Sequence, residues 1–139
     1  RDAVQLRIAG AEMTREWHEF ESLARHGCLD VYQPDVVLTL GIGGLLRLAR
    51  LLAPAGLALT PHTWGNGLQL LANAHAAAAA GLSPYLEFPF DPPEWTPARR
   101  DFMLLNPVGA DADGMLTLSE SPGLGCLLDE DRLKATRIE

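Results

Sequence analysis

The sequence has few of the features that mark secreted, membrane or nucleic-acid-binding proteins. Its two cysteines, Cys28 and Cys126, stand in unrelated contexts without CxxC spacing, which favours a reduced cytoplasmic protein over a disulfide scaffold. No apolar run approaches the roughly 18 residues of a membrane span, and the N-terminus has no apolar signal segment. The net charge of −7, with no Lys/Arg stripe to offset it, argues against a nucleic-acid surface. We therefore expect a cytoplasmic protein with no nucleic-acid or membrane partner.

What the chain does contain is enough apolar sequence for one α/β domain. Its 139 residues are 47% hydrophobic and 21% charged, and aromatic residues contribute only 6%. A chain of this length can bury a real hydrophobic core. It does not begin with methionine, and a strand-like run starts already at Val4. This beginning suggests a fragment or a processed piece of a longer protein.

Alternating strand-like and helix-like segments predict a parallel α/β architecture. Four short apolar runs are the expected strands: 4–9, 31–33, 57–60 and 85–88. Three segments between them are the expected helices, the first with Thr14 as its cap: 14–26, 45–53 and 68–81. This order is typical of βαβ units, in which the strands are parallel and the crossovers are right-handed.

The character of the sequence changes after Phe90. Asp91-Pro92-Pro93 opens a proline-rich, irregular stretch. Asp113-Gly114 and residues 122–125 are turn signals, and Asp129 is placed to cap a short closing helix. We therefore expect residues 1–90 to form the β/α units and residues 91–139 to form a covering tail of the same domain.

Four isolated polar residues each end a short apolar run at nearly constant spacing: Glu12, Asp35, His62 and Glu87. The intervals are 23, 27 and 25 residues, about the length of one strand, one helix and two loops. Consecutive parallel strands place their C-terminal ends on one rim, so the four side chains are expected to meet there. Carboxylates and a histidine on one rim favour a site for metal-assisted proton transfer.

Five strings along the chain carry a family resemblance. They are IAGAE (8–12), DVYQPD (30–35), TPHTWGNG (60–67), YLEFPFDPP (85–93) and DADGMLTLSESPGLGCLLDED (111–131). Together they resemble the enolase superfamily, within it the mandelate racemase/muconate lactonizing enzyme group, and more narrowly its acid-sugar dehydratases and cycloisomerases. The strings keep the family's order but match only its C-terminal portion. The resemblance implies the C-terminal half of a (β/α)7β TIM-type barrel, with four parallel strands and three helices.

The resemblance also implies a role for each residue on the rim. Glu12 would be the third carboxylate ligand of Mg²⁺. Asp35 would hydrogen-bond His62, and this pair would act as the general base or acid on one face of the substrate's α-carbon. Glu87 would lie near the substrate carboxylate or its enolate oxygen and help to stabilise it.

These roles agree with the chemistry of the residue types. Removing a proton α to a carboxylate creates an enolate, which Mg²⁺ stabilises, and Mg²⁺ prefers hard oxygen ligands. A histidine can exchange protons near neutral pH. Trp64 and Asn66, in the loop after His62, are further candidates for substrate contact. The implied substrate is a small carboxylate, an acid sugar, and the reaction is dehydration, racemisation or cycloisomerisation.

Parts of the family's machinery have no counterpart in this sequence. The first two metal ligands, the catalytic lysine and the capping domain belong to earlier segments of such an enzyme, and Ala11 stands where the family usually has a second glycine. We therefore expect the chain alone to be inactive. The alternative function is a catalytically incompetent half-barrel. Because four strands cannot close a barrel, either possibility predicts a homo-oligomer or association with the missing half.

The candidate residues also have structural explanations that the sequence leaves open. Glu12 can be a helix-entry carboxylate, Asp35 a turn residue after proline, and His62 a packed histidine. Gly41-Ile42-Gly43-Gly44 invites a nucleotide-binding, flavodoxin-like interpretation, but it lacks the third glycine of GxGxxG and a following Lys-Ser/Thr. A tight turn that lets a helix start close to the rim is the better interpretation of these glycines.

Overall fold

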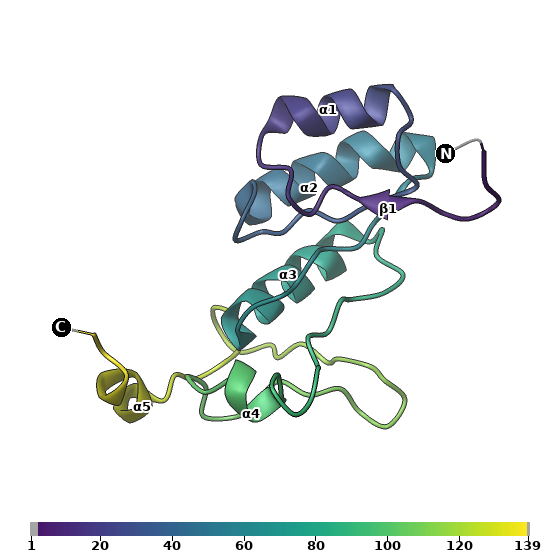
Figure 1. Cartoon of the computed structure of the whole chain (residues 1–139). Helices are drawn as coiled ribbons and strands as arrows, with labels where there is room; N and C mark the ends of the chain where they lie inside the picture. The colour runs from purple at the N-terminus through teal and green to yellow at the C-terminus, as the bar shows by residue number, and fades with distance from the viewer. Residues whose placement is uncertain (1–2, 139) are drawn as a thin grey trace.

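Three β/α units and a longer C-terminal segment make up the computed structural model, which describes residues 3–138 (Figure 1). Strands β1 (Ala9–Gly10), β2 (Val31–Tyr32) and β3 (Ala58–Leu59) form one parallel sheet in the order β1-β2-β3. Val31 pairs with Ala9 on one side and with Ala58 on the other. The parallel order is the one that the alternating sequence predicts. Among the described residues, no helix is both long and apolar enough to cross a bilayer.

Three helices connect and follow the strands: α1 (Trp17–Arg25), α2 (Gly41–Leu52) and α3 (Gly67–Ala80). They follow one another down the view of Figure 1, and α2 packs against both α1 and α3. A short 3₁₀ turn, η1 (Ala53–Ala55), ends the α2 segment. Gly81, with φ of 66°, ends α3 in the left-handed conformation that favours glycine.

Two helix starts differ from the sequence-based expectation. Thr14 does not cap α1. The helix begins at Trp17 with Glu16 in the cap position, and the Glu16 N–H donates to the Glu19 carboxylate at 3.0 Å. Residues 41–44 are not a turn before a later helix, because they form the first turn of α2. A Cβ on Gly44 would lie 2.1 Å from the Cβ of Leu40, so the helix can start there only with glycine. Gly44 is therefore needed for the close approach of Leu40, whereas a Cβ on Gly41 or Gly43 would meet no atom within 4 Å.

The main core lies between the sheet and the helices. Leu45, Leu48 and Leu52 lie on one face of α2, at the spacing of a single helical stripe. Ala76 on α3 lets the two helices approach closely. The buried members of this core are Phe20, Tyr32, Val36, Leu45, Leu48, Ala49, Leu52, Leu57, Leu59 and Ala76.

The expected fourth strand at 85–88 does not form, so in the described part of the chain the sheet has three strands. The Leu59 N–H donates to the Leu82 carbonyl at 3.3 Å, which brings this segment beside β3. Pro84 follows and has no N–H with which to continue the ladder. The segment therefore runs near β3 without pairing with it.

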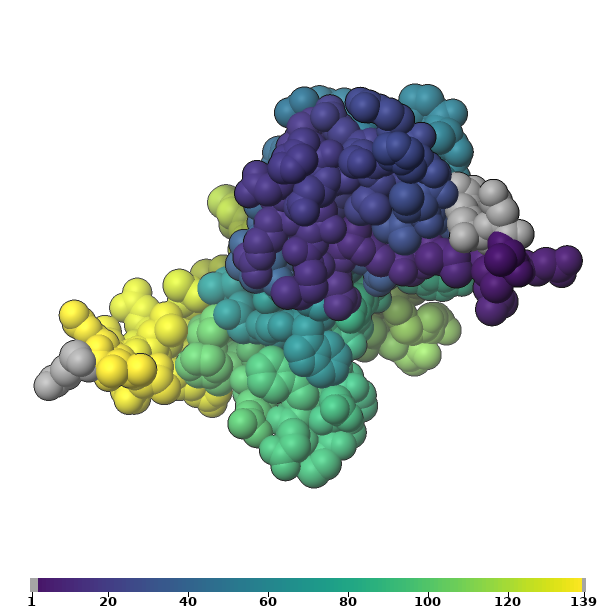
Figure 2. Space-filling model, turned by 45° about the horizontal axis from the view of Figure 1, so that its top comes forward, coloured from purple at the N-terminus to yellow at the C-terminus, as the bar shows by residue number. Residues whose placement is uncertain are grey.

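Residues 91–138 pack against α3 through a second apolar cluster. This segment contains the short helices α4 (Pro97–Arg100), which was not predicted, and α5 (Glu130–Ala135), which was. Asp129 caps α5 as expected, accepting from the Arg132 N–H at 3.0 Å. Figure 1 shows the segment below α3, and Figure 2 shows its C-terminal end projecting from the body. The buried residues of the second cluster are Leu71, Met103 and Leu104.

A buried ion pair fixes the start of this segment. Arg100 and Asp101 are both fully buried at the side chain, and the guanidinium Nε lies 2.6 Å from Asp101 Oδ1. Arg100 also donates to the Pro89 carbonyl at 3.1 Å and stacks on Phe88, with 4.5 Å to the ring centroid. Asp101 accepts from the Val108 N–H at 2.7 Å. The pair therefore holds the chain on both sides of α4 in place.

Candidate active site

Glu12, Asp35 and His62 come together just beyond the C-terminal ends of the three strands. They follow β1, β2 and β3 by two or three residues each. Backbone hydrogen bonds between the segments that follow β2 and β3 continue past the strands. The Thr60 N–H donates to the Tyr32 carbonyl at 2.9 Å, and the His62 N–H donates to the Pro34 carbonyl at 3.0 Å. The loops that carry the aspartate and the histidine are therefore held rigidly side by side.

Asp35 is fully buried, and both of its carboxylate oxygens accept hydrogen bonds. Oδ1 accepts from the Val37 N–H at 2.9 Å and from Asn73 Nδ2 at 3.3 Å. Oδ2 accepts from His62 Nδ1 at 3.1 Å and from Gln69 Nε2. A buried carboxylate needs such donors to offset its desolvation, and here they also fix the plane of the group.

The imidazole of His62 lies between two carboxylates. Because Asp35 Oδ2 is an acceptor, the hydrogen of the neutral ring is on Nδ1. Nε2 is then unprotonated and lies 4.0 Å from Glu12 Oε2. The side chain is 15% exposed, so Nε2 can be reached from the rim while Nδ1 is held inside. This arrangement suits a side chain that accepts a proton from a bound molecule.

Glu12 is the exposed member of the group, with 54% of its side chain accessible. The residue before it, Ala11, has φ of 78°, a left-handed conformation that costs a non-glycine residue about 1 kcal/mol. In the family that the sequence resembles, this position is usually a glycine, which adopts such a conformation without strain. The local backbone thus turns out of β1 sharply enough to bring Glu12 toward His62.

The fit of these residues to a magnesium ion is partial. A carboxylate oxygen at Glu12 is the kind of hard donor that Mg²⁺ prefers. Within residues 3–138, however, no group of three or more His, Cys, Asp or Glu side chains could hold a metal ion. The described residues therefore offer one suitable ligand and not a complete metal site.

The other three candidates take different positions around the loop after His62. Glu87 Oε2 accepts from the Thr63 N–H at 2.7 Å, which ties the 85–88 segment to this loop. Trp64 is half exposed, with 52% of its surface accessible. Asn66 caps α3, where its side-chain oxygen accepts from the Gln69 N–H at 3.1 Å. The structure thus brings Glu87 and the loop together and gives Asn66 a helix-capping contact.

Sequence reasoning missed two residues of the site, Gln69 and Asn73 on α3. Both donate to Asp35, and Asn73 is fully buried. A signal was present in the sequence, because the two carboxamides are four residues apart in a helix whose only other polar side chain is that of His75. Residues at this spacing share one helix face, and a buried amide on that face requires a polar partner.

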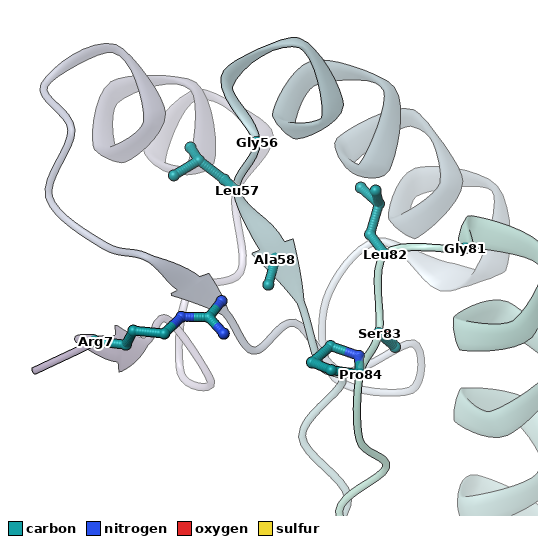
Figure 3. A pocket seen from close by; sticks show the side chains of 8 residues that line it. All are labelled: Arg7, Gly56, Leu57, Ala58, Gly81, Leu82, Ser83 and Pro84. Atoms are coloured by element: carbon teal, nitrogen blue, oxygen red, sulfur yellow. The ribbon is translucent and has the colours of Figure 1, made fainter.

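A pocket of about 410 Å³ lies at the opposite ends of the strands (Figure 3). Gly56 and Leu57, at the entrance to β3, form one side, and residues 81–84 form the other. Among residues 3–138, Arg7 is its one charged lining residue. The described lining thus contains no carboxylate or imidazole and offers none of the proton-transfer groups found at the rim.

Comparison with known proteins identifies the family of the chain. Residues 1–132 match the family model described as enolase C-terminal domain-like. The chain belongs to this family. As an enolase C-terminal domain-like chain, it has an α/β, TIM-barrel-like fold, of which the described residues contribute a three-stranded parallel sheet and five α-helices.

Similar proteins act on acid sugars or their lactones, as their names state. The chain is 28% identical to D-galactarolactone cycloisomerase of Agrobacterium fabrum over 94% of its length and 35% of that protein. It is 30% identical to arabinonate dehydratase of Saccharolobus solfataricus over 89% of its length and 32% of that protein. The structure also resembles that of a mandelate racemase/muconate lactonizing enzyme-like protein from Rubrobacter xylanophilus, with 27% identity and a TM-score of 0.83. This match covers all of the present chain and 34% of that protein. The chain thus spans about a third of the length of the relatives it matches.

Proposed function

We propose that this chain is part of a Mg²⁺-dependent enzyme that removes the proton α to the carboxylate of an acid sugar. The observation that supports this most strongly is the imidazole of His62, with Nδ1 held by Asp35 at 3.1 Å and Nε2 open toward the rim. The relatives named above are a cycloisomerase and a dehydratase, reactions that can share this first step. We refer below to the assembled barrel, meaning this chain together with the part of the fold that its longer relatives carry.

In the proposed reaction, His62 Nε2 accepts the α-proton and the C–H electron pair passes into the enolate. The resulting imidazolium carries its second hydrogen on Nδ1, where the Asp35 carboxylate stabilises the new charge. The same Nε2–H can then return its proton to the same face of the α-carbon, which restores the substrate, or protonate a departing hydroxide, which gives dehydration. Racemisation would need a second acid on the opposite face, supplied by the rest of the assembled barrel.

The remaining candidates would bind and orient the substrate. Glu12 is proposed as one carboxylate ligand of Mg²⁺, with the other ligands supplied by the rest of the assembled barrel. When bound, Mg²⁺ would stabilise negative charge on the substrate carboxylate. Glu87 is proposed to lie near the substrate carboxylate or enolate oxygen, and Trp64 and Asn66 to contact the substrate from the loop after His62.

A substrate screen tests this proposal. The assembled barrel, incubated with a panel of aldonates and aldarates that includes arabinonate, should convert at least one of them, as detected by product NMR. Removal of divalent ions with EDTA should abolish the conversion, and added Mg²⁺ should restore it. Conversion that is unaffected by EDTA, or no conversion of any acid sugar, would contradict the proposal.

The second candidate is a non-catalytic half-barrel that assembles with copies of itself. The observation in its favour is the number of large apolar side chains left exposed on α2 and on the segments that flank the strands. They include Val4, Leu6, Met13, Val37, Ile42, Leu51, Tyr85 and Phe90. Monomers rarely expose this much apolar surface in contiguous patches.

Analytical ultracentrifugation of the 139-residue chain checks the association that this surface predicts. We expect a species clearly heavier than the 15.0 kDa monomer, because association would bury the exposed apolar side chains. A single monomer at all concentrations would rule out self-association. A Mg²⁺ titration of the chain beside the assembled barrel separates the two functions. A lone Glu12 should bind the ion only weakly, whereas the assembled barrel binds it tightly only if Glu12 is one ligand of a complete site.

A further inference from the structure

Two carboxamide side chains on α3 contact Asp35, the residue that holds the proposed base His62. Gln69 and Asn73 lie four residues apart, on the face of α3 that meets Asp35. Most of the helix around them is alanine and leucine, and Asn73 is fully buried. Burying an amide is costly unless its donors and acceptors are paired, so the contacts of these two side chains need an explanation.

The orientation of the Asn73 amide is set by the backbone around it. Its Oδ1 accepts from the Val36 N–H at 3.0 Å, so Nδ2 must face acceptors. Nδ2 donates to Asp35 Oδ1 at 3.3 Å and to the His62 carbonyl at 3.0 Å. One side chain thus joins the residues that follow β2 to the residue that follows β3. Asn73 thereby fixes the distance between Asp35 and His62.

Gln69 acts on the other oxygen of the carboxylate. Its Nε2 donates to Asp35 Oδ2, the same oxygen that accepts from His62 Nδ1. The backbone of Gly65 passes close to this amide, and a Cβ on Gly65 would lie 1.6 Å from Gln69 Oε1. Glycine at 65 therefore leaves the space in which Gln69 reaches Asp35.

We propose that Gln69 and Asn73 are positioning residues that lock the Asp35 carboxylate in the orientation that keeps His62 Nδ1 protonated and Nε2 free. With each oxygen held by one carboxamide, the carboxylate cannot rotate away from the imidazole. The proposal rests on the proposed role of His62 as the base. It adds that the orientation of this base is set by α3, a helix that itself does not contact the reacting atoms.

Three substitutions remove the contacts of the carboxamides with Asp35, two of them at Gln69 and one at Asn73. Gln69→Met keeps the length of the side chain and removes its donor. Gly65→Ala leaves Gln69 in the sequence but displaces its amide. Asn73→Asp keeps the acceptor for the Val36 N–H and replaces the donor to Asp35 with a second carboxylate. Leu71→Ala is the matched control, because it lies on the same helix, loses buried packing in the second cluster and has no contact with Asp35.

The kinetic expectation is a separation of kcat from KM in the assembled barrel. Each of the three variants should lower kcat by about 10-fold or more with KM within about threefold, because orientation of a base affects the transition state more than substrate binding. The effects of Gly65→Ala and Gln69→Met on kcat should not add when the two substitutions are combined, since both remove the same contact. Leu71→Ala should lower the melting temperature without changing kcat at temperatures where it is folded.

A chemical readout decides the proposal without turnover. Diethyl pyrocarbonate modifies the unprotonated nitrogen of a histidine, and mass spectrometry gives the rate at each site. A carboxylate that accepts from Nδ1–H keeps Nε2 unprotonated and directed toward the rim, where the reagent attacks, so the rate at His62 should fall several-fold in the Gln69→Met and Gly65→Ala variants. The exposed His18 and His26 provide internal controls and should react at unchanged rates.

The outcomes of this experiment test the positioning role of Gln69 and Asn73 separately from the proposed role of His62 as the base. A slower reaction at His62 with unchanged His18 supports the lock, even if no acid sugar is turned over. An unchanged or faster reaction at His62 in both variants would overturn it, because a purely structural role would leave or increase the access of the reagent. If the reaction slows but turnover does not depend on His62, the lock stands and the proposed function fails.

Discussion

Replacing His62 with asparagine is expected to lower kcat of the assembled barrel by about 10²–10⁴-fold, the usual contribution of a general base. The asparagine amide can still donate to Asp35 Oδ2 in place of Nδ1, so the buried carboxylate keeps a partner. What the variant lacks is Nε2, the nitrogen that faces the rim and Glu12. KM should change by no more than a few-fold, because the side chain acts mainly in the transition state.

The matched control is His18→Asn on α1, which is exposed and has no contact with the rim residues. Initial rates over a range of substrate concentrations, with melting curves to show that both variants are folded, make the comparison complete. Asp35→Asn should show a similar loss, since an amide at this position can hold the imidazole in the wrong tautomer. A His62→Asn variant with a kcat within twofold of the parent would remove His62 as the base.

Replacing Asp101 with alanine is expected to lower the free energy of unfolding by about 3–5 kcal/mol. The substitution leaves the guanidinium of Arg100 fully buried and without its 2.6 Å partner, and unpaired buried charges carry a penalty of this order. The loop at Val108 also loses its hydrogen bond to the carboxylate. Urea denaturation of the chain, followed by circular dichroism, measures the change.

The neighbouring pair provides a control of matched geometry and opposite burial. Arg99 and Glu94 lie 3.0 Å apart, but their side chains are 63% and 81% exposed. Glu94→Ala should therefore cost less than about 1 kcal/mol. If both substitutions have equally small effects, the ion pair at Arg100 does not hold the segment. The double variant Arg100→Met/Asp101→Leu should recover much of the loss, because no charge then remains buried.

The parts of the fold that depend on local pattern were predictable from the sequence. Strand and helix alternation gave the order and the parallel direction of β1, β2 and β3, and Asp129 marked the start of α5. The spacing of Glu12, Asp35 and His62 placed these side chains beside one another, as the distances of 3.1 and 4.0 Å show. Both results follow from the fixed repeat of a β/α unit.

The parts that depend on contacts between distant residues were not predictable. Thr14 is a good cap by residue type, but α1 begins at Trp17, where the N–H of the cap residue Glu16 is paired with the Glu19 carboxylate. The 85–88 run has the composition of a strand, but Pro84 interrupts the ladder that would pair it with β3. The roles of Gln69 and Asn73 depend on the position of Asp35 across the helix, which no local pattern specifies.

Deuterium wash-in at the substrate α-carbon tests the central claim most directly. In D₂O, with a substrate found by the screen, the assembled barrel should exchange the α-proton for solvent deuterium, seen as loss of its ¹H NMR signal. The His62→Asn variant, folded and bound to the same substrate, should show no exchange from the face that this histidine serves. Exchange at the parental rate in that variant would contradict the assignment of proton transfer to His62 and Asp35.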